Sequence, residues 1–328
     1  MHLLDKLLGK KTAPEEDSDS WLEEYRELLF GEGHTRDTIM QSTRLKVSHM
    51  PDHLYKYRCF TPNHLKALEA GQLYAASITS LNDMKEANLV PTEAFRKDLC
   101  QKTYNIIRER TGNVLPEAHV ETQQEIDDAI TAHFRKVSGG KRGSGNFVVK
   151  FIELSRTVAD KLREEALEKY LERLRTTYSI CSLSARNDIS KMWERYSEDH
   201  EGFCIEYDFK SFGLGNPVCD LICPVLYVED NTIFINSLDE VDPVFVMMAS
   251  SMKDRETWAY EKEWRRFYKR EEAGKPQDMP KPTAIYLGEK ASTDNTNWMK
   301  DFCSRNSIPL YRMKYNKKKD RFIPEKVS

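Results

Sequence analysis

Long apolar runs are absent from this sequence of 328 residues, so we expect no membrane-spanning helix. The longest apolar stretch lies near residues 244–249 and is far shorter than the roughly 18 residues that a spanning helix needs. Residues 1–8 include Asp5 and Lys6 and lack a small-residue cleavage site, so the sequence predicts no secretory leader. These absences predict a cytoplasmic protein.

Paired cysteines are also missing. The chain has 7 cysteines, which is an odd number, and no C-x-x-C motif. The one close pair is Cys219 and Cys223, and no histidine or cysteine near it has the spacing of zinc ligands. We therefore expect reduced thiols and no metal ion.

A large excess of charge of one sign is missing as well. The 50 Lys and Arg residues nearly balance the 53 Asp and Glu residues, which leaves a formal charge of −3. This balance excludes a generally basic nucleic-acid-binding protein, although it permits a local basic patch. With 39% hydrophobic and 31% charged residues, the composition is that of a globular protein of one large or two small domains.

The common motifs of nucleotide and ester chemistry do not occur. The chain has no G-x-x-x-x-G-K-[ST] phosphate loop and no G-x-G-x-x-G turn after a strand. It also lacks H-E-x-x-H and G-x-S-x-G. The sequence therefore argues against a kinase, a P-loop NTPase, a Rossmann dehydrogenase and an α/β-hydrolase.

The apolar pattern divides the chain into an extension and a core. Residues 1–50 form a helical extension, which could dock on this chain or on a partner protein. Residues 51–328 form the core, and a helical insertion over about 92–177 interrupts it. A glycine-rich break lies at 138–146 within the insertion. We predict an α+β fold with a small mixed or antiparallel sheet.

The predicted strands of the core are short and have irregular connections. They outnumber the helices after residue 177, which favours an α+β domain over a doubly wound sheet. The expected strands are 54–58, 73–77, 178–184, 202–208, 223–228, 263–269, 283–287 and 308–315, with helices near 188–197, 241–256 and 294–305.

The tetrapeptide YKYR at 55–58 is a candidate anion site. Strand alternation places its two tyrosines on one face and Lys56 and Arg58 on the other. The basic pair could bind a phosphate, because Arg does so with two parallel hydrogen bonds. The alternative is an ordinary solvent-exposed strand face.

Further polar and aromatic candidates follow a later strand. Ser182 and Ser184 point to one side of it, where they could cap the next helix or hold a ligand's ribose. Trp193 and Tyr196 share a helix face, so they either pack in the core or wall a pocket for a base or nicotinamide. We interpret His200 as a turn residue.

Two glutamates close the set of candidates. Glu261 and Glu263 are two residues apart and share one face of an extended segment. Paired carboxylates suit the positioning of a cation, the stabilisation of an oxocarbenium-like centre or general-base catalysis. The alternative is that each glutamate pairs with a basic neighbour such as Lys262 or Arg265.

Several of these segments together resemble domain-of-unknown-function family 2971. Family members usually carry F-N-D-P-F after the second strand, and here Asn82 and Asp83 are kept without the flanking aromatics. The segments that carry the resemblance are YKYR at 55–58, LYAASITSLND at 73–83, CSLSARND at 181–188, MWERY at 192–196, HEGFCIEYD at 200–208, LYV at 226–228 and YEKEWR at 260–265.

The order of elements is more remotely similar to the ADP-ribosyltransferase fold, and this resemblance implies that the protein binds NAD. Enzymes of that fold carry a basic residue on a first strand and a Ser or Tyr on a middle strand. By this resemblance Arg58 or Lys56 contacts the phosphate or ribose of NAD, and Trp193 or Tyr196 stacks on the nicotinamide. The residues implied to bind the cofactor are Lys56, Tyr57, Arg58, Asn82, Ser182, Ser184, Trp193 and Tyr196.

The same resemblance implies a catalytic role for the two glutamates. Glu263 would hold the nicotinamide ribose and stabilise the oxocarbenium-like transition state, and Glu261 would help to activate an acceptor. We therefore expect an NAD-using ADP-ribosyltransferase or NAD glycohydrolase that needs no metal, in the role of a toxin or an anti-phage defence effector. The acceptor would be a protein or a nucleic acid.

Two other functions are compatible with the sequence. A metal-dependent nuclease could draw Mg²⁺ ligands from Asp188, Glu206, Asp208, Glu261 and Glu263. A binding module without catalysis could use the basic run between residues 312 and 326, either as a solvated tail or as a contact to nucleic-acid phosphates.

Overall fold

A computed structural model describes residues 20–30, 35–77, 88–139, 144–229, 232–235, 238, 246–247, 249–269, 275–319 and 321–327. The candidate Asn82 lies outside these residues. The chain divides into two compact units, the first formed by 1–77, 179–229 and 251–328 and the second by 78–178 and 230–250. In the described parts of the chain, no helix has the length and apolar character needed to cross a membrane.

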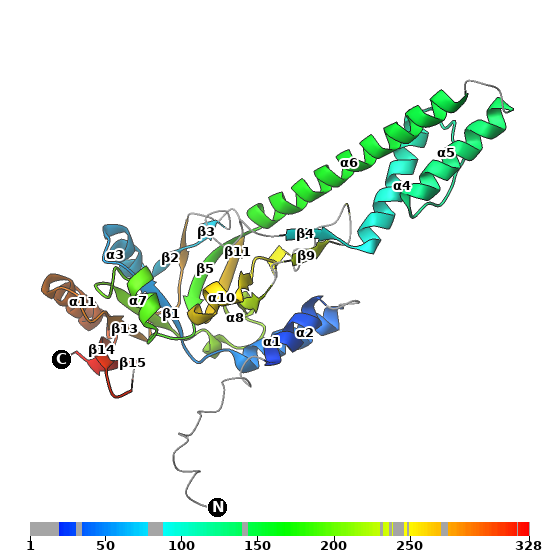
Figure 1. Ribbon diagram of the computed structural model, residues 1–328. Coiled ribbons are helices and arrows are strands. Elements are labelled where there is room, and N and C mark those ends of the chain that lie inside the picture. Colours follow the sequence, from blue (N-terminus) through cyan, green and yellow to red (C-terminus); the bar gives the residue numbers. More distant parts are fainter. Residues whose placement is uncertain are drawn as a thin grey trace, which may run out of the picture. The chain divides into compact units, whose positions relative to one another are not determined.

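The first unit is built on a mostly antiparallel sheet, so the expected α+β class with strands and helices is confirmed (Figure 1). The strands run in the order β15-β14-β13-β6-β1-β5-β11-β7, with β3 paired to β5. Their bounds are β1 (Leu54–Arg58), β3 (Ala76–Ser77), β5 (Tyr178–Ser184), β6 (Phe203–Tyr207), β7 (Ile222–Pro224), β11 (Glu263–Lys269), β13 (Ala284–Leu287), β14 (Leu310–Asn316) and β15 (Arg321–Lys326).

Short strand pairs and helices accompany this sheet. The pairs are β2 (Gln72–Tyr74) with β12 (Pro276–Asp278), and β8 (Leu226–Val228) with β10 (Met252–Asp254). The helices are α1 (Ser20–Phe30), α2 (Arg36–His49), α3 (Pro62–Glu69), α7 (Ser190–Tyr196), α8 (Pro217–Asp220), α10 (Arg255–Trp258) and α11 (Thr293–Asn306), with 3₁₀ turns η3 (Lys210–Phe212) and η4 (Ala259–Glu261).

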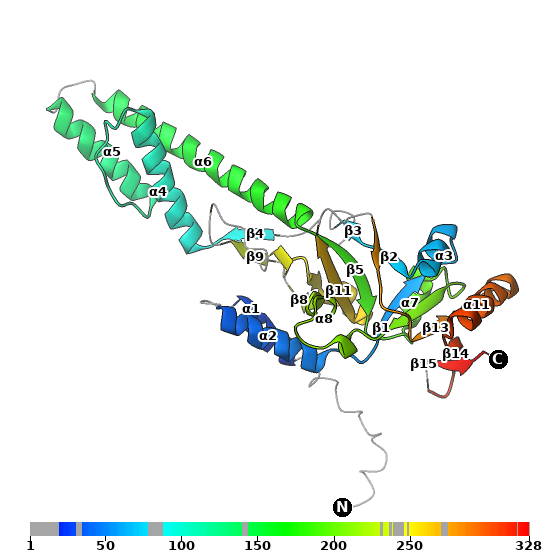
Figure 2. The ribbon, with the colours of Figure 1, turned by 180° about the vertical axis from the view of Figure 1, so that it is seen from behind.

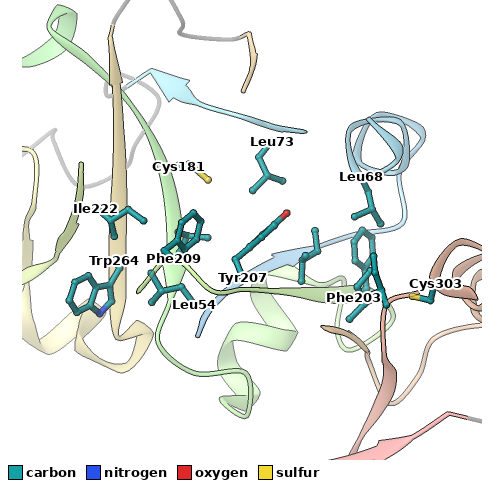
Figure 3. Packing of buried hydrophobic residues seen from close by; sticks show 14 of the residues in the cluster. Leu54, Leu68, Leu73, Cys181, Phe203, Tyr207, Phe209, Ile222, Trp264 and Cys303 are labelled. Carbon is teal, nitrogen blue, oxygen red and sulfur yellow. The ribbon is translucent and has the colours of Figure 1, made fainter. Parts of the chain in front are cut away.

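The two faces of strand β1 differ, and the difference decides which candidate residues can meet. Leu54 lies in the larger apolar cluster of the first unit, whereas Tyr57 packs in a second cluster with Trp193 and Cys204. Figure 3 shows part of the larger cluster, with side chains from β1, β5 and β6. By alternation, Lys56 and Arg58 share the face of Leu54.

Strand β1 pairs closely with one neighbour and only briefly with the other. Five residue pairs register β1 with β6, whereas β1 and β5 are in register at Tyr55 and Ser184. The ammonium of Lys56 donates to the carbonyl oxygen of Ser182 at 2.6 Å. This side-chain bond therefore occupies a position that a continued strand ladder would fill with a backbone N–H.

A left-handed turn connects α7 to β6. Glu198, Asp199 and His200 all have positive φ, a conformation that non-glycine residues rarely adopt in succession. Gly202 and Gly288 make this turn possible, because a Cβ at these positions would collide with the carbonyl oxygens of Arg58 and His200 respectively. His200 is thus a turn residue, as the sequence predicted.

The helices α1 and α2 belong to the first unit. Trp21 of α1 stacks on His49 of α2 with ring centroids 4.6 Å apart, and on Trp264 of β11 at 6.2 Å. The predicted extension therefore docks on its own chain. Helix α2 is not predicted by the apolar pattern, because its apolar residues form only a weak stripe.

The second unit contains three helices that pack side by side and a parallel strand pair (Figure 2). The helices are α4 (Glu93–Arg110), α5 (Gln123–Ser138) and α6 (Ser144–Thr176), and the strands are β4 (Asn88–Pro91) and β9 (Thr232–Ile235). A capping box between Thr122 and Glu125 starts α5. The helices expected over about 92–177 lie in this unit. Residues 230–250 also belong to it, and nothing in the sequence predicts this.

Two expected elements differ from the structure. Of the helix predicted near 241–256, residues 246, 247 and 249 are helical and 241–245 and 248 lie outside the described residues, but the last part of the range forms strand β10 and the short helix α10, where Lys253 pairs with buried carboxylates. The basic run between 312 and 326 is not a tail but the hairpin of β14 and β15, which pairs Tyr315 with Phe322. Tyr315 and Phe322 lie in edge-to-face contact, which favours strand pairing over a solvated chain.

Candidate functional site

Two buried glutamates share one ammonium group. The Nζ of Lys253 donates to Glu261 Oε2 and to Glu263 Oε2, both at 2.8 Å. All three residues are at most 5% exposed. Buried carboxylates this close would repel each other strongly, and the ammonium of Lys253 between them offsets that repulsion.

Glu263 is held as an anion. Arg265 donates from Nε to Glu263 Oε1 at 2.9 Å and from Nη2 to Oε2 at 3.3 Å. Burial opposes ionisation, but Arg265 and Lys253 outweigh it and lower the pKa of Glu263 to about 2. Glu263 therefore cannot act as a proton donor near neutral pH, and its remaining chemical use is to accept a hydrogen bond or to contact a cation.

Tyrosine hydroxyls complete the partners of Glu261. Tyr196 donates to Glu261 Oε1 at 2.6 Å and Tyr260 donates to the same oxygen at 3.3 Å. Burial, followed by the bond to Glu261, raises the pKa of Tyr196. Tyr196 remains 36% exposed, so it links the buried carboxylates to the surface.

Cations and aromatic rings surround this link. The guanidinium of Arg195 lies 4.5 Å from the centroid of the Trp258 ring, and the Nζ of Lys253 lies 4.4 Å from the same centroid. The ammonium of Lys191 lies 4.0 Å from the Tyr260 ring centroid. These contacts fix the rings around Glu261 by cation–π attraction.

The strand β5 connects the glutamates to the basic strand β1. Ser184 is buried and donates its hydroxyl to the backbone oxygen of Glu261 at 2.7 Å. The carbonyl of Ser182 accepts from Lys56. The predicted residues Lys56, Ser182, Ser184 and Glu263 therefore lie on three neighbouring strands, β1, β5 and β11, and Glu261 lies in the 3₁₀ turn η4 just before β11. The expectation that Glu261 and Glu263 share one face of an extended segment is wrong, because Lys262 between them has a left-handed backbone.

Lys56 and Arg58 form a basic pair on the opposite face of the sheet. Burial, together with the charge of Arg58, lowers the pKa of Lys56 to about 8. Burial likewise lowers the pKa of Arg58, and the groups that oppose this shift are Cys181, Tyr207 and Cys59, with no carboxylate among them. Within the described residues, the guanidinium of Arg58, which is partly buried, has no hydrogen bond or ion pair.

Two predicted ligand-binding side chains lie in the core. Trp193 is 0% exposed, donates its Nε1–H to the carbonyl of Asn187 and packs edge-to-face on Tyr57. Tyr57 is itself buried and donates its hydroxyl to the carbonyl of Arg186. A fully buried indole leaves no face for a nicotinamide, so of the two predicted stacking residues only Tyr196 is placed to contact a ligand.

The acidic residues of the nuclease alternative have other partners. The ammonium of Lys253 lies between Glu261 and Glu263, at the place where a metal bound by both would lie. Glu206 accepts from Tyr286 and Thr283, and Asp188 accepts two hydrogen bonds from Arg186. Asp208 accepts from the backbone of Ser211. In the described portion, no three His, Cys, Asp or Glu residues are grouped to hold a metal ion.

Sequence reasoning missed two members of the site. Lys253 was assigned to a helix, and no motif marks it as the partner of residues 261 and 263. Tyr227 accepts from the backbone N–H of Glu263 at 2.8 Å, which positions the start of β11. The signal that could have revealed Lys253 is physical, because two buried carboxylates close together require a cation between them.

Comparison with known proteins gives one match. No curated protein and no solved structure matches the chain. Residues 192–266, which include Tyr196, Lys253, Glu261 and Glu263, match the model of the family described as "Protein of unknown function (DUF2971)". The predicted resemblance to domain-of-unknown-function family 2971 is thereby confirmed over this segment.

Proposed function

We propose that this protein breaks the nicotinamide–ribose bond of NAD and transfers ADP-ribose to water or to a macromolecular acceptor. The observation that carries the proposal is the placement of a basic pair, two serines and Glu263 on the adjacent strands β1, β5 and β11, with Glu261 in the turn η4 directly before β11. The resemblance to the ADP-ribosyltransferase fold implies this order of residue types. The strand order supports it.

Arg58 and Lys56 supply the charge that a diphosphate needs. Both side chains are partly buried, and a bound anion offsets the cost of removing their charges from water. Arg58 can donate two parallel hydrogen bonds to a phosphate. In our proposal this pair anchors the diphosphate of NAD where β1 and β5 stop pairing.

Glu263 would contact the ribose. It accepts three hydrogen bonds from Lys253 and Arg265, and a carboxylate has about four lone-pair sites, so one acceptor position remains. The cluster of two carboxylates and two cations is neutral overall. A positively charged sugar is therefore stabilised by direct contact with the carboxylate of Glu263 and not by a long-range electrostatic field.

The proposed step balances without a metal or a redox partner. The bond between the sugar C1′ and the nicotinamide nitrogen breaks, and its electron pair leaves with the neutral nicotinamide. The electron-deficient sugar carbon then forms a bond to the acceptor oxygen or nitrogen, which loses a proton. With water as acceptor, the products are ADP-ribose and nicotinamide.

The positions of the charged groups restrict where NAD can bind. The basic pair and the glutamates lie on opposite faces of the sheet. A single NAD molecule must therefore reach both through the region where β1 and β5 separate. If it cannot, Arg58 and Glu263 belong to different sites and their variants will affect different measurements.

Nicotinamide release from NAD tests the proposal. We expect release by the wild-type protein and loss of at least about 100-fold in Glu263→Gln, because one transition-state contact typically contributes that much. Glu165→Gln on the exposed face of α6 is the matched control and should keep full activity. Tyr196→Phe keeps the aromatic ring and should also lower the rate of nicotinamide release. It provides a second test in case Glu263→Gln does not fold. Unchanged release in folded Glu263→Gln would contradict the assignment.

A further inference from the structure

The tip of the β14–β15 hairpin concentrates exposed positive charge. Lys317, Lys318, Lys319 and Arg321 are all exposed, and among the residues with a described structure none of these four has an acidic partner. Elsewhere, exposed lysines such as Lys97, Lys161 and Lys290 lie beside carboxylates. The four cations, which we call the hairpin tip, lie within five consecutive residues that also include Asp320, in a chain whose formal charge is −3.

The hairpin tip is an ordered turn. The side-chain oxygen of Asn316 accepts from the backbone N–H groups of Lys318 and Lys319, at 3.0 and 3.1 Å. Arg312 at the base of the hairpin donates to Thr296 Oγ1 at 2.6 Å and to the carbonyl of Ala291 at 3.2 Å. The lysines are thus held on a fixed backbone, which lowers the entropy lost when they bind a partner.

One aromatic ring lies next to these cations. Tyr315 is 43% exposed and rests edge-to-face on the buried Phe322, with ring centroids 5.4 Å apart. An exposed ring supported from below can stack on a base, and stacking combined with backbone cations is how proteins bind single strands. Lysines on an edge strand can also serve to prevent aggregation, but Lys317, Lys318 and Lys319 lie in the turn, beyond the strand itself.

From this charge and this ring we propose that the hairpin tip and Tyr315 bind single-stranded nucleic acid. Phosphates neutralise the four unpaired cations, and Tyr315 stacks on one base. An anionic membrane is the less favoured partner, because only Tyr315 at the tip offers an exposed large hydrophobic side chain among the described residues. The proposal does not depend on NAD chemistry.

Fluorescence anisotropy with a labelled uridine 20-mer, measured with the full chain between 50 and 200 mM salt, tests it. Each phosphate contact to a single strand contributes about −0.7 to the slope of log affinity against log salt. We expect the triple variant Lys317→Gln, Lys318→Gln, Lys319→Gln to weaken binding at least about tenfold and to reduce the slope by about 2. The matched control removes three exposed lysines of α6 (Lys150, Lys161 and Lys169) and should bind like wild type.

Tyr315→Ala separates stacking from charge. We expect it to weaken binding at least about fivefold while leaving the salt slope unchanged, because stacking involves no released counterion. Tyr74→Ala, which removes a tyrosine that is 46% exposed on β2, is its control. The proposal is overturned if the wild type does not bind the oligonucleotide, if the α6 control is weakened equally, or if anionic phosphatidylserine vesicles bind and the oligonucleotide does not.

Discussion

Individual residues in this protein differ sharply in how completely their charges are paired. Glu261 and Glu263 have a cation or a hydroxyl at every oxygen, whereas the guanidinium of Arg58, which is partly buried, has no partner in the described structure. The paired carboxylates form a cluster of defined geometry. The unpaired guanidinium of Arg58 is a site at which an anion can bind favourably.

Removing the shared ammonium should destabilise the fold in a pH-dependent way. Lys253→Met leaves two buried carboxylates facing each other, so we expect a loss of about 3–5 kcal/mol in the free energy of unfolding at pH 7. One carboxylate then binds a proton more readily in the folded state, so stability should recover as pH falls from 7 to 5. Urea unfolding at both pH values measures this.

The control for that variant is Lys161→Met. Lys161 lies 3.7 Å from Glu165 on an exposed helix face, where such a pair contributes about 0–1 kcal/mol. Equal losses in the two variants, or a Lys253→Met protein that is no less stable at pH 7 than at pH 5, would show that the buried pair does not depend on this ammonium.

Anion binding at Lys56 should weaken above pH 8. Burial lowers the pKa of Lys56 from 10.5 to about 8, so the free protein loses this charge near that pH. Because the unfolded chain keeps the proton up to about 10.4, stability without ligand rises over the same window while affinity for NAD falls. Calorimetric titrations from pH 6 to 10 measure the effect. Lys56→Arg, which stays charged, should bind equally at both ends of the range.

At the scale of elements, the left-handed turn between α7 and β6 holds the helix that carries Tyr196. The backbone of Gly202 donates to Ser197, and Lys290 donates its N–H to the carbonyl of His200. The turn therefore ties α7 both to β6 and to the segment after β13. Its positive φ values are a local cost that these contacts offset.

Substitution of either close-packed glycine should release this turn. A Cβ at Gly202 or Gly288 meets backbone oxygen, which cannot move aside as a side chain could. We expect Gly202→Ala and Gly288→Ala each to cost about 2 kcal/mol or more of unfolding free energy, measured by chemical denaturation. Gly145→Ala, where the added carbon meets open space within α6, should be neutral or stabilising. A Gly202→Ala protein as stable as the Gly145→Ala protein would contradict this role.

Across the whole molecule, the parts that sequence could predict are those set by local pattern. The strands β1, β5, β6, β11 and β13 and the helices α4, α5 and α6 follow from alternation and helical periodicity. Alternation along one strand predicts that Glu261 and Glu263 share a face, whereas the structure brings them together at Lys253 through the turn η4 and the left-handed backbone of Lys262. What could not be predicted depends on contacts between distant segments.

Lys253 shows this limit most clearly. Its segment has helical character in isolation, and only the buried carboxylates of Glu261 and Glu263 and the pairing with β8 make it a strand. The joining of 230–250 to the helical unit has the same origin, because β9 gains its order from pairing with β4. The separation of Lys56 and Arg58 from the glutamates follows from register, which a single sequence does not fix.

The most direct test is a calorimetric titration of NAD into the wild-type protein and into Arg58→Gln, with the unfolding free energy of both proteins measured alongside. We expect Arg58→Gln to bind NAD at least about tenfold more weakly. We also expect it to be at least as stable as the wild type, because the guanidinium that is removed makes no hydrogen bond or ion pair in the described structure. Equal NAD affinity in the two proteins, or no NAD binding by the folded wild type, would contradict it.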